Sequence, residues 1–133
     1  MQSPEPAETH KYPHGKTGLA RIFHTLIYSR DGFFAALRGE PAFRQLLALH
    51  GVLMGLALAL DVSPGERALL LAVSFISLLV ELLNSAIEAV VDRISLEPHP
   101  LSKNAKDMGS AAQTTALLMV GAVWTVILGG PGN

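Results

Sequence analysis

The sequence lacks cysteine altogether, and it has fewer charged residues than a soluble domain of its size. Without cysteine the chain has neither a disulfide framework nor a thiolate metal site. Charged residues make up 16% of its 133 residues, whereas soluble domains carry roughly 25%. Half of the residues are apolar, and the mean hydropathy is +0.38. This length has room for one domain, and the composition indicates a small membrane protein.

Several other features are missing. No basic run is long enough to indicate nucleic-acid binding, and the net charge is −1. Residues 1–18 have no apolar stretch of the kind found in signal peptides. They are polar and rich in proline and glycine, so we expect a disordered tail ahead of a single domain at 19–133. The triplet Gly-Lys-Thr at 15–17 is no phosphate-binding loop, because His10 stands where that loop needs glycine.

Three apolar stretches approach the roughly 20 residues that a helix needs to cross a bilayer. They predict spans at about 43–61, 66–93 and 106–129. The segment 61–67 between the first two contains proline and glycine. The segment 93–107 between the second and third is polar and is interrupted by Pro98 and Pro100. The sequence therefore predicts an all-α membrane protein with three transmembrane helices.

Residues 19–38 have a different pattern, in which apolar side chains recur at helical spacing. Arg21, His24 and Arg30 interrupt the run, so this segment cannot span a membrane. We expect an amphipathic helix that lies in the plane of the membrane interface. The alternative is a helix packed on a soluble core, for which the rest of the chain offers no partner.

The placement of positive charge predicts an orientation. Six of the ten lysines and arginines lie within 1–44, three lie within 93–107, one lies within 61–67, and none follows the third span. By the positive-inside rule, the amino terminus and the segment 93–107 face the cytoplasm. The surface helix and this segment are therefore expected on the side where ATP is available.

Within residues 68–92, the second span carries seven polar side chains. At about 100° per residue, all of them fall within a sector about 100° wide. They are Ser74, Ser77, Glu81, Asn84, Ser85, Glu88 and Asp92. Ionisable groups inside a membrane face protein or water and indicate function. The alternative is a seam that only joins helices, for which serine and asparagine would suffice and two carboxylates are a poor choice.

Depth separates the two glutamates. With Arg67 as the outer boundary, Glu81 lies about 21 Å and Glu88 about 32 Å into the membrane. Across about 30 Å of hydrocarbon, Glu88 reaches the cytoplasmic surface and Glu81 stays about 9 Å beneath it. We therefore expect Glu81 to act as a shielded general base and Glu88 to reach a hydrated metal ion. Hard carboxylate oxygens favour Mg²⁺ over Zn²⁺.

The third span has a matching polar face at its cytoplasmic end, where Lys106, Ser110 and Gln113 align and Asp107 lies at the edge. A lysine beside carboxylates suits a phosphate that a metal ion and an ammonium hold together. The alternative interpretation of Lys106 is a positive-inside anchor. Of the histidines, His50 in the first span is expected to be a buried group with satisfied hydrogen bonds.

The segments ELLNSAIEAVVDRI at 81–94 and AKDMGSAA at 105–112 closely resemble the small prokaryotic diacylglycerol kinase family. EPAFRQ at 40–45 resembles the same family ahead of its first span. The spacing ExxNxxxExxxD upstream of AKD is highly specific, and the similarity covers nearly the whole chain beyond the tail. The family pattern has tryptophan where Arg30 stands, and Tyr-His-Glu where this chain has Pro-His-Pro at 98–100.

The resemblance implies an integral-membrane homotrimer of the bacterial inner membrane, with active sites shared between neighbouring subunits. It implies transfer of the γ-phosphoryl group of MgATP to the hydroxyl of diacylglycerol, which gives phosphatidic acid. By position it implies that Glu81 is the catalytic base and that Glu40 and Glu88 are the metal ligands. The implied ATP contacts are Arg21, Tyr28, Glu40, Glu88, Glu97, His99, Lys106 and Asp107. The implied acceptor-side residues are Arg44, Gln45, Glu81, Asn84 and Ser110.

Two alternatives to a diacylglycerol kinase stay open at this point. Undecaprenol kinase has the same fold, although AFRQ at 42–45 and MGSAA at 108–112 look more like the diacylglycerol form. From a different class, the chain could be a non-catalytic membrane subunit whose polar stripe binds a partner helix or conducts protons. ATP turnover with a lipid alcohol would distinguish an enzyme from such a subunit.

Overall fold

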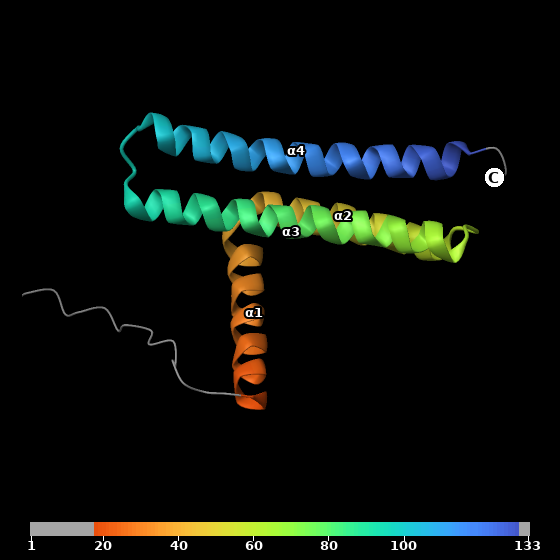
Figure 1. Cartoon of the computed structure of the whole chain (residues 1–133), viewed down its shortest axis with the longest axis horizontal. Coiled ribbons are helices and arrows are strands. Elements are labelled where there is room, and N and C mark those ends of the chain that lie inside the picture. The colour runs from red at the N-terminus through yellow and green to blue at the C-terminus, as the bar shows by residue number, and fades with distance from the viewer. Residues whose placement is uncertain (1–17, 131–133) are drawn as a thin grey trace, which may run out of the picture. The chain divides into compact units, whose positions relative to one another are not determined.

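A computed structural model describes residues 18–130 of the chain. The predicted tail at 1–18 therefore lies, apart from Gly18, outside the described residues. The elements in chain order are α1 (Leu19–Gly39), α2 (Pro41–Ala59), α3 (Pro64–Ile94) and α4 (Pro100–Gly129) (Figure 1). The chain divides into two compact units, and the division falls within α1, after Gly32.

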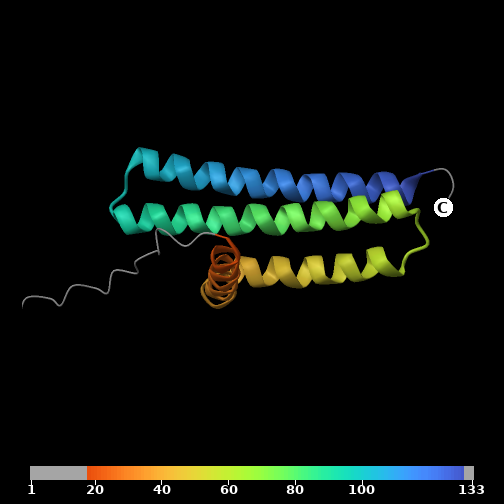
Figure 2. The ribbon, with the colours of Figure 1, turned by 60° about the horizontal axis from the view of Figure 1, so that its bottom comes forward.

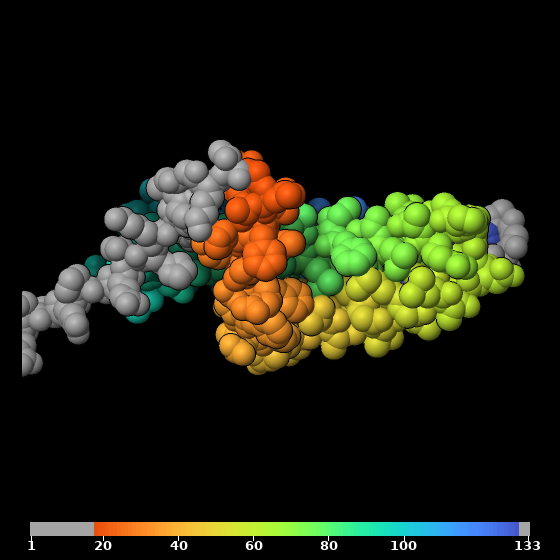
Figure 3. Space-filling model, turned by 90° about the horizontal axis from the view of Figure 1, so that it is seen from below, coloured from red at the N-terminus to blue at the C-terminus, as the bar shows by residue number. Residues whose placement is uncertain are grey.

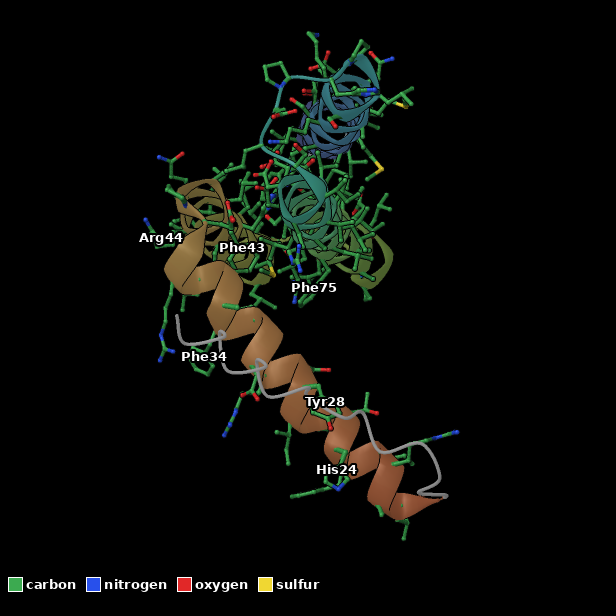
Figure 4. The ribbon with its side chains drawn as sticks, turned by 90° about the vertical axis from the view of Figure 1, so that its left-hand side faces the viewer. His24, Tyr28, Phe34, Phe43, Arg44 and Phe75 are labelled. Carbon is green, nitrogen blue, oxygen red and sulfur yellow. The ribbon has the colours of Figure 1, made fainter. Side chains whose placement is uncertain are left out.

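The part of α1 that belongs to the first unit is amphipathic. Four apolar side chains at helical spacing are each more than half exposed: Leu19, Ile22, Phe23 and Leu26. One turn apart on the same helix, the rings of His24 and Tyr28 stack with their centroids 6.3 Å apart (Figure 4). An exposed apolar stripe is what a helix in a membrane interface requires, and that location stays a prediction.

The second unit contains the three long helices. They run antiparallel, and α3 packs against both α2 and α4 (Figure 2). Within residues 18–130, α2 and α4 do not pack on each other. Figure 3 shows α2 and α3 side by side along one face. All three helices are long and apolar enough to cross a membrane, which confirms that the chain has three candidate spans.

Proline opens each of these helices, at Pro41, Pro64 and Pro100. Proline is favoured at the first helical position because no backbone donor is needed there and its fixed φ suits the helix. The prediction that 93–107 is a connecting segment is therefore wrong from Pro100 onward. Only residues 95–99 connect α3 to α4, and α4 begins ahead of the predicted start at about 106.

Apolar clusters hold α3 to its neighbours. Phe43 of α2 and Leu78 of α3 share one cluster with Ala36. Ala57 of α2 and Leu70 of α3 share another with Ile127 of α4. On the outer faces, apolar side chains stay largely exposed, as expected for helices surrounded by lipid. Examples are Val52, Phe75, Leu118 and Val126.

Candidate active site

The polar stripe of α3 is buried at one end and open at the other. Ser74 and Ser77 are fully buried, and Glu81 is 4% exposed. Towards the α3–α4 connection, Glu88 is half-buried and Asp92 is exposed. Within the chain, Glu81 is therefore the shielded carboxylate and Glu88 the more accessible one.

Two other carboxylates lie close enough to Glu81 to influence it. Glu88 and Glu40 both act electrostatically on Glu81. Glu81 and Glu88 are separated by about two helical turns of α3. Glu40 occupies the N-cap position of α2, but its side chain makes no capping hydrogen bond there. Negative charge from two helix segments is thus concentrated at one place, which favours the binding of a cation.

Lys106 of α4 brings a positive charge to the same region. Its Nζ lies 2.6 Å from Oδ1 of Asp92, and the charge of Glu88 also acts on it. The two side chains of the ion pair are 40% and 46% exposed, so the pair contributes little to stability. Lys106 can therefore exchange Asp92 for another anion at small cost.

Asn84 connects the stripe to α4. Its Nδ2 donates a hydrogen bond to Glu88 Oε1 at 3.3 Å. Gly109 of α4 lies directly against the Asn84 amide, and a Cβ at this position would overlap Oδ1. A larger residue here would force the Asn84 amide to move or the two helices to separate. Gly109 was not predicted as a site residue, and the only signal for it was its place in the segment AKDMGSAA.

A second link between α3 and α4 is fully inside the bundle. Gln113 Nε2 donates to Ser77 Oγ at 3.1 Å. Of the predicted polar face of the third span, Lys106 and Gln113 contact α3, whereas Ser110 is exposed. The structure of one chain therefore does not bring Ser110 to the stripe.

A pocket of about 630 Å³ lies beside the α3–α4 connection. Four of the predicted nucleotide contacts line it: Glu97, His99, Lys106 and Asp107. His99 Nδ1 accepts a hydrogen bond from the Leu101 backbone N–H at 3.2 Å, which caps α4. Lys103 and Asp107 form an ion pair on the same side of the helix. The pocket offers groups of both charges to a polar ligand.

The remaining predicted residues lie elsewhere. The Arg44 guanidinium donates to the backbone carbonyls of Leu37 and Arg38, each at 3.1 Å, and so holds the end of α1 at the start of α2 (Figure 4). Gln45 is exposed on α2. Arg21 and Tyr28 belong to the first unit, and their contact with a nucleotide stays a prediction.

The structure has carboxylates of the type that binds magnesium at the start of α2 and on α3. Among residues 18–130, no group of three or more histidine, aspartate or glutamate side chains could hold a metal ion by itself. Mg²⁺ is usually held by one or two carboxylates together with substrate phosphates and water. Glu40 and Glu88 are two carboxylates whose charges act on Glu81.

Comparisons with known proteins show which family the sequence matches. Residues 27–128 match the family described as prokaryotic diacylglycerol kinase. The chain is 63% identical over 114 residues to a diacylglycerol kinase of Pseudomonas aeruginosa, covering 86% of this chain and 93% of the relative. It is 46% identical over 116 residues to a diacylglycerol kinase of Escherichia coli, covering 84% and 92%. A Helicobacter pylori diacylglycerol kinase is 46% identical over 114 residues, covering 84% of each chain.

Proposed function

The chain belongs to the prokaryotic diacylglycerol kinase family, and we propose that it transfers the γ-phosphoryl group of MgATP to the hydroxyl of diacylglycerol. The observation that carries this proposal is the charge cluster of α2, α3 and α4. In this cluster, the charges of Glu88 and Glu40 act on the shielded carboxylate of Glu81. The charge of Glu88 also acts on Lys106. The names of the relatives support diacylglycerol as the acceptor. The product is phosphatidic acid.

Glu81 is the proposed general base. The lipid hydroxyl oxygen attacks the γ-phosphorus, and the hydroxyl proton passes to the Glu81 carboxylate. The bond between the γ-phosphorus and the β–γ bridging oxygen breaks, and ADP leaves with that oxygen. Because Glu81 is only 4% exposed, little bulk water competes with the lipid hydroxyl for the base. Phosphoryl transfer depends mainly on such positioning and on charge neutralisation.

The nucleotide would occupy the region between the carboxylates and the pocket. Glu40 and Glu88 would hold Mg²⁺, which when bound neutralises charge on the β- and γ-phosphates. Lys106 would leave Asp92 to contact a phosphate oxygen. Further ATP contacts are proposed for three residues that line the pocket, Glu97, His99 and Asp107. Two residues on α1, Arg21 and Tyr28, are proposed as ATP contacts on the resemblance alone.

The acceptor side and the membrane arrangement follow from the resemblance and from the distribution of charge. The proposed acceptor-side residues, besides Glu81, are Arg44, Gln45, Asn84 and Ser110. We propose one membrane-embedded kinase domain at 19–133, with α1 in the interface plane. The domain would form a homotrimer in the bacterial inner membrane with shared active sites. The excess of lysine and arginine in 1–44 and 93–107 supports a cytoplasmic amino terminus and α3–α4 connection.

The test compares Glu81→Gln with the wild type in detergent, using labelled ATP and either diacylglycerol or undecaprenol. We expect Glu81→Gln to lose on the order of 10²–10⁴ in turnover, the usual contribution of a general base. Its oligomeric mass and thermal unfolding should match the wild type. Glu66→Gln is the control, because Glu66 lies on the same helix at its opposite end. Near-wild-type turnover of Glu81→Gln would remove Glu81 from the base role, and preferential phosphorylation of undecaprenol would replace the proposed lipid.

A further inference from the structure

The corner between α1 and α2 consists of a single residue, Glu40, whose backbone is extended, as is favoured before a proline. Pro41 has no N–H to offer the Leu37 carbonyl four residues earlier, which a helical amide at this position would bond. The Arg44 guanidinium replaces that donor. Its Nη1 donates to the carbonyls of Leu37 and Arg38, each at 3.1 Å. One side chain therefore holds the end of α1 against the start of α2 (Figure 4).

The same arrangement recurs where α2 leads into α3. Arg67 follows Pro64 by three residues, as Arg44 follows Pro41. Arg67 Nη2 donates to the Leu60 carbonyl at 3.0 Å, and this carbonyl again lies four residues before the proline. An arginine three residues after a proline thus supplies the donor that the proline lacks at both ends of α2.

Between its two ends, α2 has no polar restraint of this kind among the described residues. His50 lies in the middle of the helix and is 0% exposed, but neither of its ring nitrogens has a hydrogen-bond partner within residues 18–130. The prediction that His50 is satisfied is therefore wrong for this part of the chain. The polar restraints on α2 are those at its two ends.

We propose that Arg44 is a positioning residue for Glu40, because it fixes the corner from which that carboxylate projects. The Glu40 side chain makes no capping hydrogen bond, so within the chain its direction depends on the backbone of the corner. Arg44 restrains this backbone by joining the helices on either side of it. This role differs from the acceptor-side contact that the resemblance implies for Arg44.

An apolar contact seats the same corner on α3. Phe43 is fully buried and shares a cluster with Ala36 of α1 and Leu78 of α3. Leu78 precedes Glu81 by three residues, about one helical turn, and the charge of Glu40 acts on Glu81. The apolar cluster therefore determines where the corner lies on α3, and the arginine determines how the chain turns there.

The two arginines differ in what their loss should cost. The hydrogen bonds of Arg44 are exposed, so water can satisfy the two carbonyls and the stability of the fold should change little. The hydrogen bond of Arg67 is partly buried, so its loss leaves a carbonyl with less access to water and should cost more. The effect of Arg44 on the reaction rests on the proposed metal role of Glu40, whereas its effect on the corner does not.

The corner is tested without any substrate by the distance between two spin labels. The chain has no cysteine, so Ala35→Cys on α1 and Ala48→Cys on α2 carry the only labels, and both positions are exposed. Labelled chains are diluted with unlabelled chains in detergent, so that each pair reports one chain. We expect a narrow distance distribution with Arg44, a wider one with Arg44→Met, and an intermediate one with Arg44→Lys, which keeps a donor. An unchanged width with Arg44→Met overturns the proposal, whatever the activity of the enzyme.

Positioning is tested by Mg²⁺ titration of lipid phosphorylation. Arg44→Met should weaken the apparent Mg²⁺ affinity about tenfold, the lower end of the loss seen when a residue that orients a metal ligand is removed. Arg44→Lys should recover part of this loss. The KM for diacylglycerol and the unfolding temperature should stay close to the wild type. A raised KM for diacylglycerol with unchanged Mg²⁺ affinity would make Arg44 a lipid contact and overturn the positioning role.

Arg67→Met is the matched control, because it removes the same kind of bond about 21 Å from Glu81 along α3. We expect it to lower the unfolding temperature by several degrees and to leave the Mg²⁺ affinity unchanged. An equal loss of Mg²⁺ affinity in Arg67→Met and Arg44→Met would mean that loosening α2 at either end is enough, which overturns the specific role of Arg44. A wider distance distribution with unchanged Mg²⁺ affinity overturns the positioning of Glu40. A wild type without kinase activity overturns the proposed reaction instead, and the spin-label result still decides the role of Arg44 at the corner.

Discussion

Gly109 of α4 packs directly against the side-chain amide of Asn84 on α3. A Cβ at position 109 would overlap Asn84 Oδ1 and lie 3.1 Å from Cγ. On its other side the same amide donates to Glu88 Oε1. The close approach of the two helices therefore holds the Asn84 amide in the orientation that donates to Glu88, the carboxylate that we assign to the metal.

Gly109→Ala should disturb this support. The added methyl group must displace the amide or separate the helices, and overpacking of this kind costs about 1–3 kcal/mol. We expect the apparent Mg²⁺ affinity to fall about tenfold and the unfolding temperature to fall by several degrees. Magnesium titrations of lipid phosphorylation and thermal unfolding in detergent measure the two effects.

Gly121→Ala is the matched control on the same helix, because nothing lies within 4 Å of a Cβ at that position. Alanine also forms helix better than glycine, so this variant should be as stable as the wild type or more stable, with unchanged kinetics. If Gly109→Ala behaves in the same way as Gly121→Ala, the contact with Asn84 has no functional importance.

Glu88→Gln should weaken the binding of Mg²⁺ and ATP rather than abolish folding. Glutamine keeps an oxygen that can accept the hydrogen bond from Asn84 but loses the charge that holds a cation. We expect the apparent affinities for both ligands to fall about tenfold or more, since interactions with charged groups are the stronger ones. Titration of each ligand at saturating concentrations of the other measures this. Unchanged titration curves would remove Glu88 from the metal site.

Lys106→Met separates the two interpretations of this lysine. If Lys106 contacts phosphate, its loss should raise the KM for ATP about tenfold or more. Asp92→Asn should leave that KM unchanged or lower it, because it frees Lys106 from its partner at 2.6 Å. Neither change should shift the unfolding temperature much, since both side chains are partly exposed. If Lys106 only anchors the helix, we expect the KM for ATP to be unchanged in both variants.

The spans and the stripe could be predicted from the sequence because each is a property of a single helix. Long apolar runs indicate membrane spans, and polar residues at helical spacing indicate one face of α3. The start of α4 was misjudged because proline usually interrupts a helix, whereas Pro100 occupies its first turn behind the His99 cap. Family membership sets aside the alternative of a non-catalytic subunit.

The contacts between helices could not be predicted in the same way. Asp92–Lys106, Ser77–Gln113 and Asn84–Gly109 each join α3 to α4. Which turn of one helix meets which turn of the other depends on the length of the connection and on packing along the whole interface. No local pattern in the sequence contains that information. Residues 95–99 form a shorter connection than the sequence indicated, and this length sets the pairing.

Ser63→Ala should lower stability without changing catalysis. Ser63 and Glu66 form a capping box at the start of α3, in which Ser63 N–H donates to Glu66 Oε2 at 2.8 Å and Glu66 N–H donates to Ser63 Oγ at 3.3 Å. Loss of the hydroxyl leaves a backbone donor unpaired, and we expect the unfolding temperature to fall by about 2–6 °C. Ser63→Asp, which keeps an oxygen acceptor at the cap, should retain the wild-type unfolding temperature.

The kinetic constants of Ser63→Ala should match the wild type, because the site is assembled at the opposite end of α3. Glu88 is 25 residues from Ser63 along the chain, about 37 Å along a helix. Near Glu88, α3 is held to α4 by the ion pair of Asp92 with Lys106 and by the packing of Gly109 on Asn84, rather than by its cap. Fraying of the first turn should therefore not reach the carboxylates. A lowered turnover of Ser63→Ala at temperatures well below unfolding would contradict this prediction. It would mean that α3 transmits a change at its first turn to Glu81.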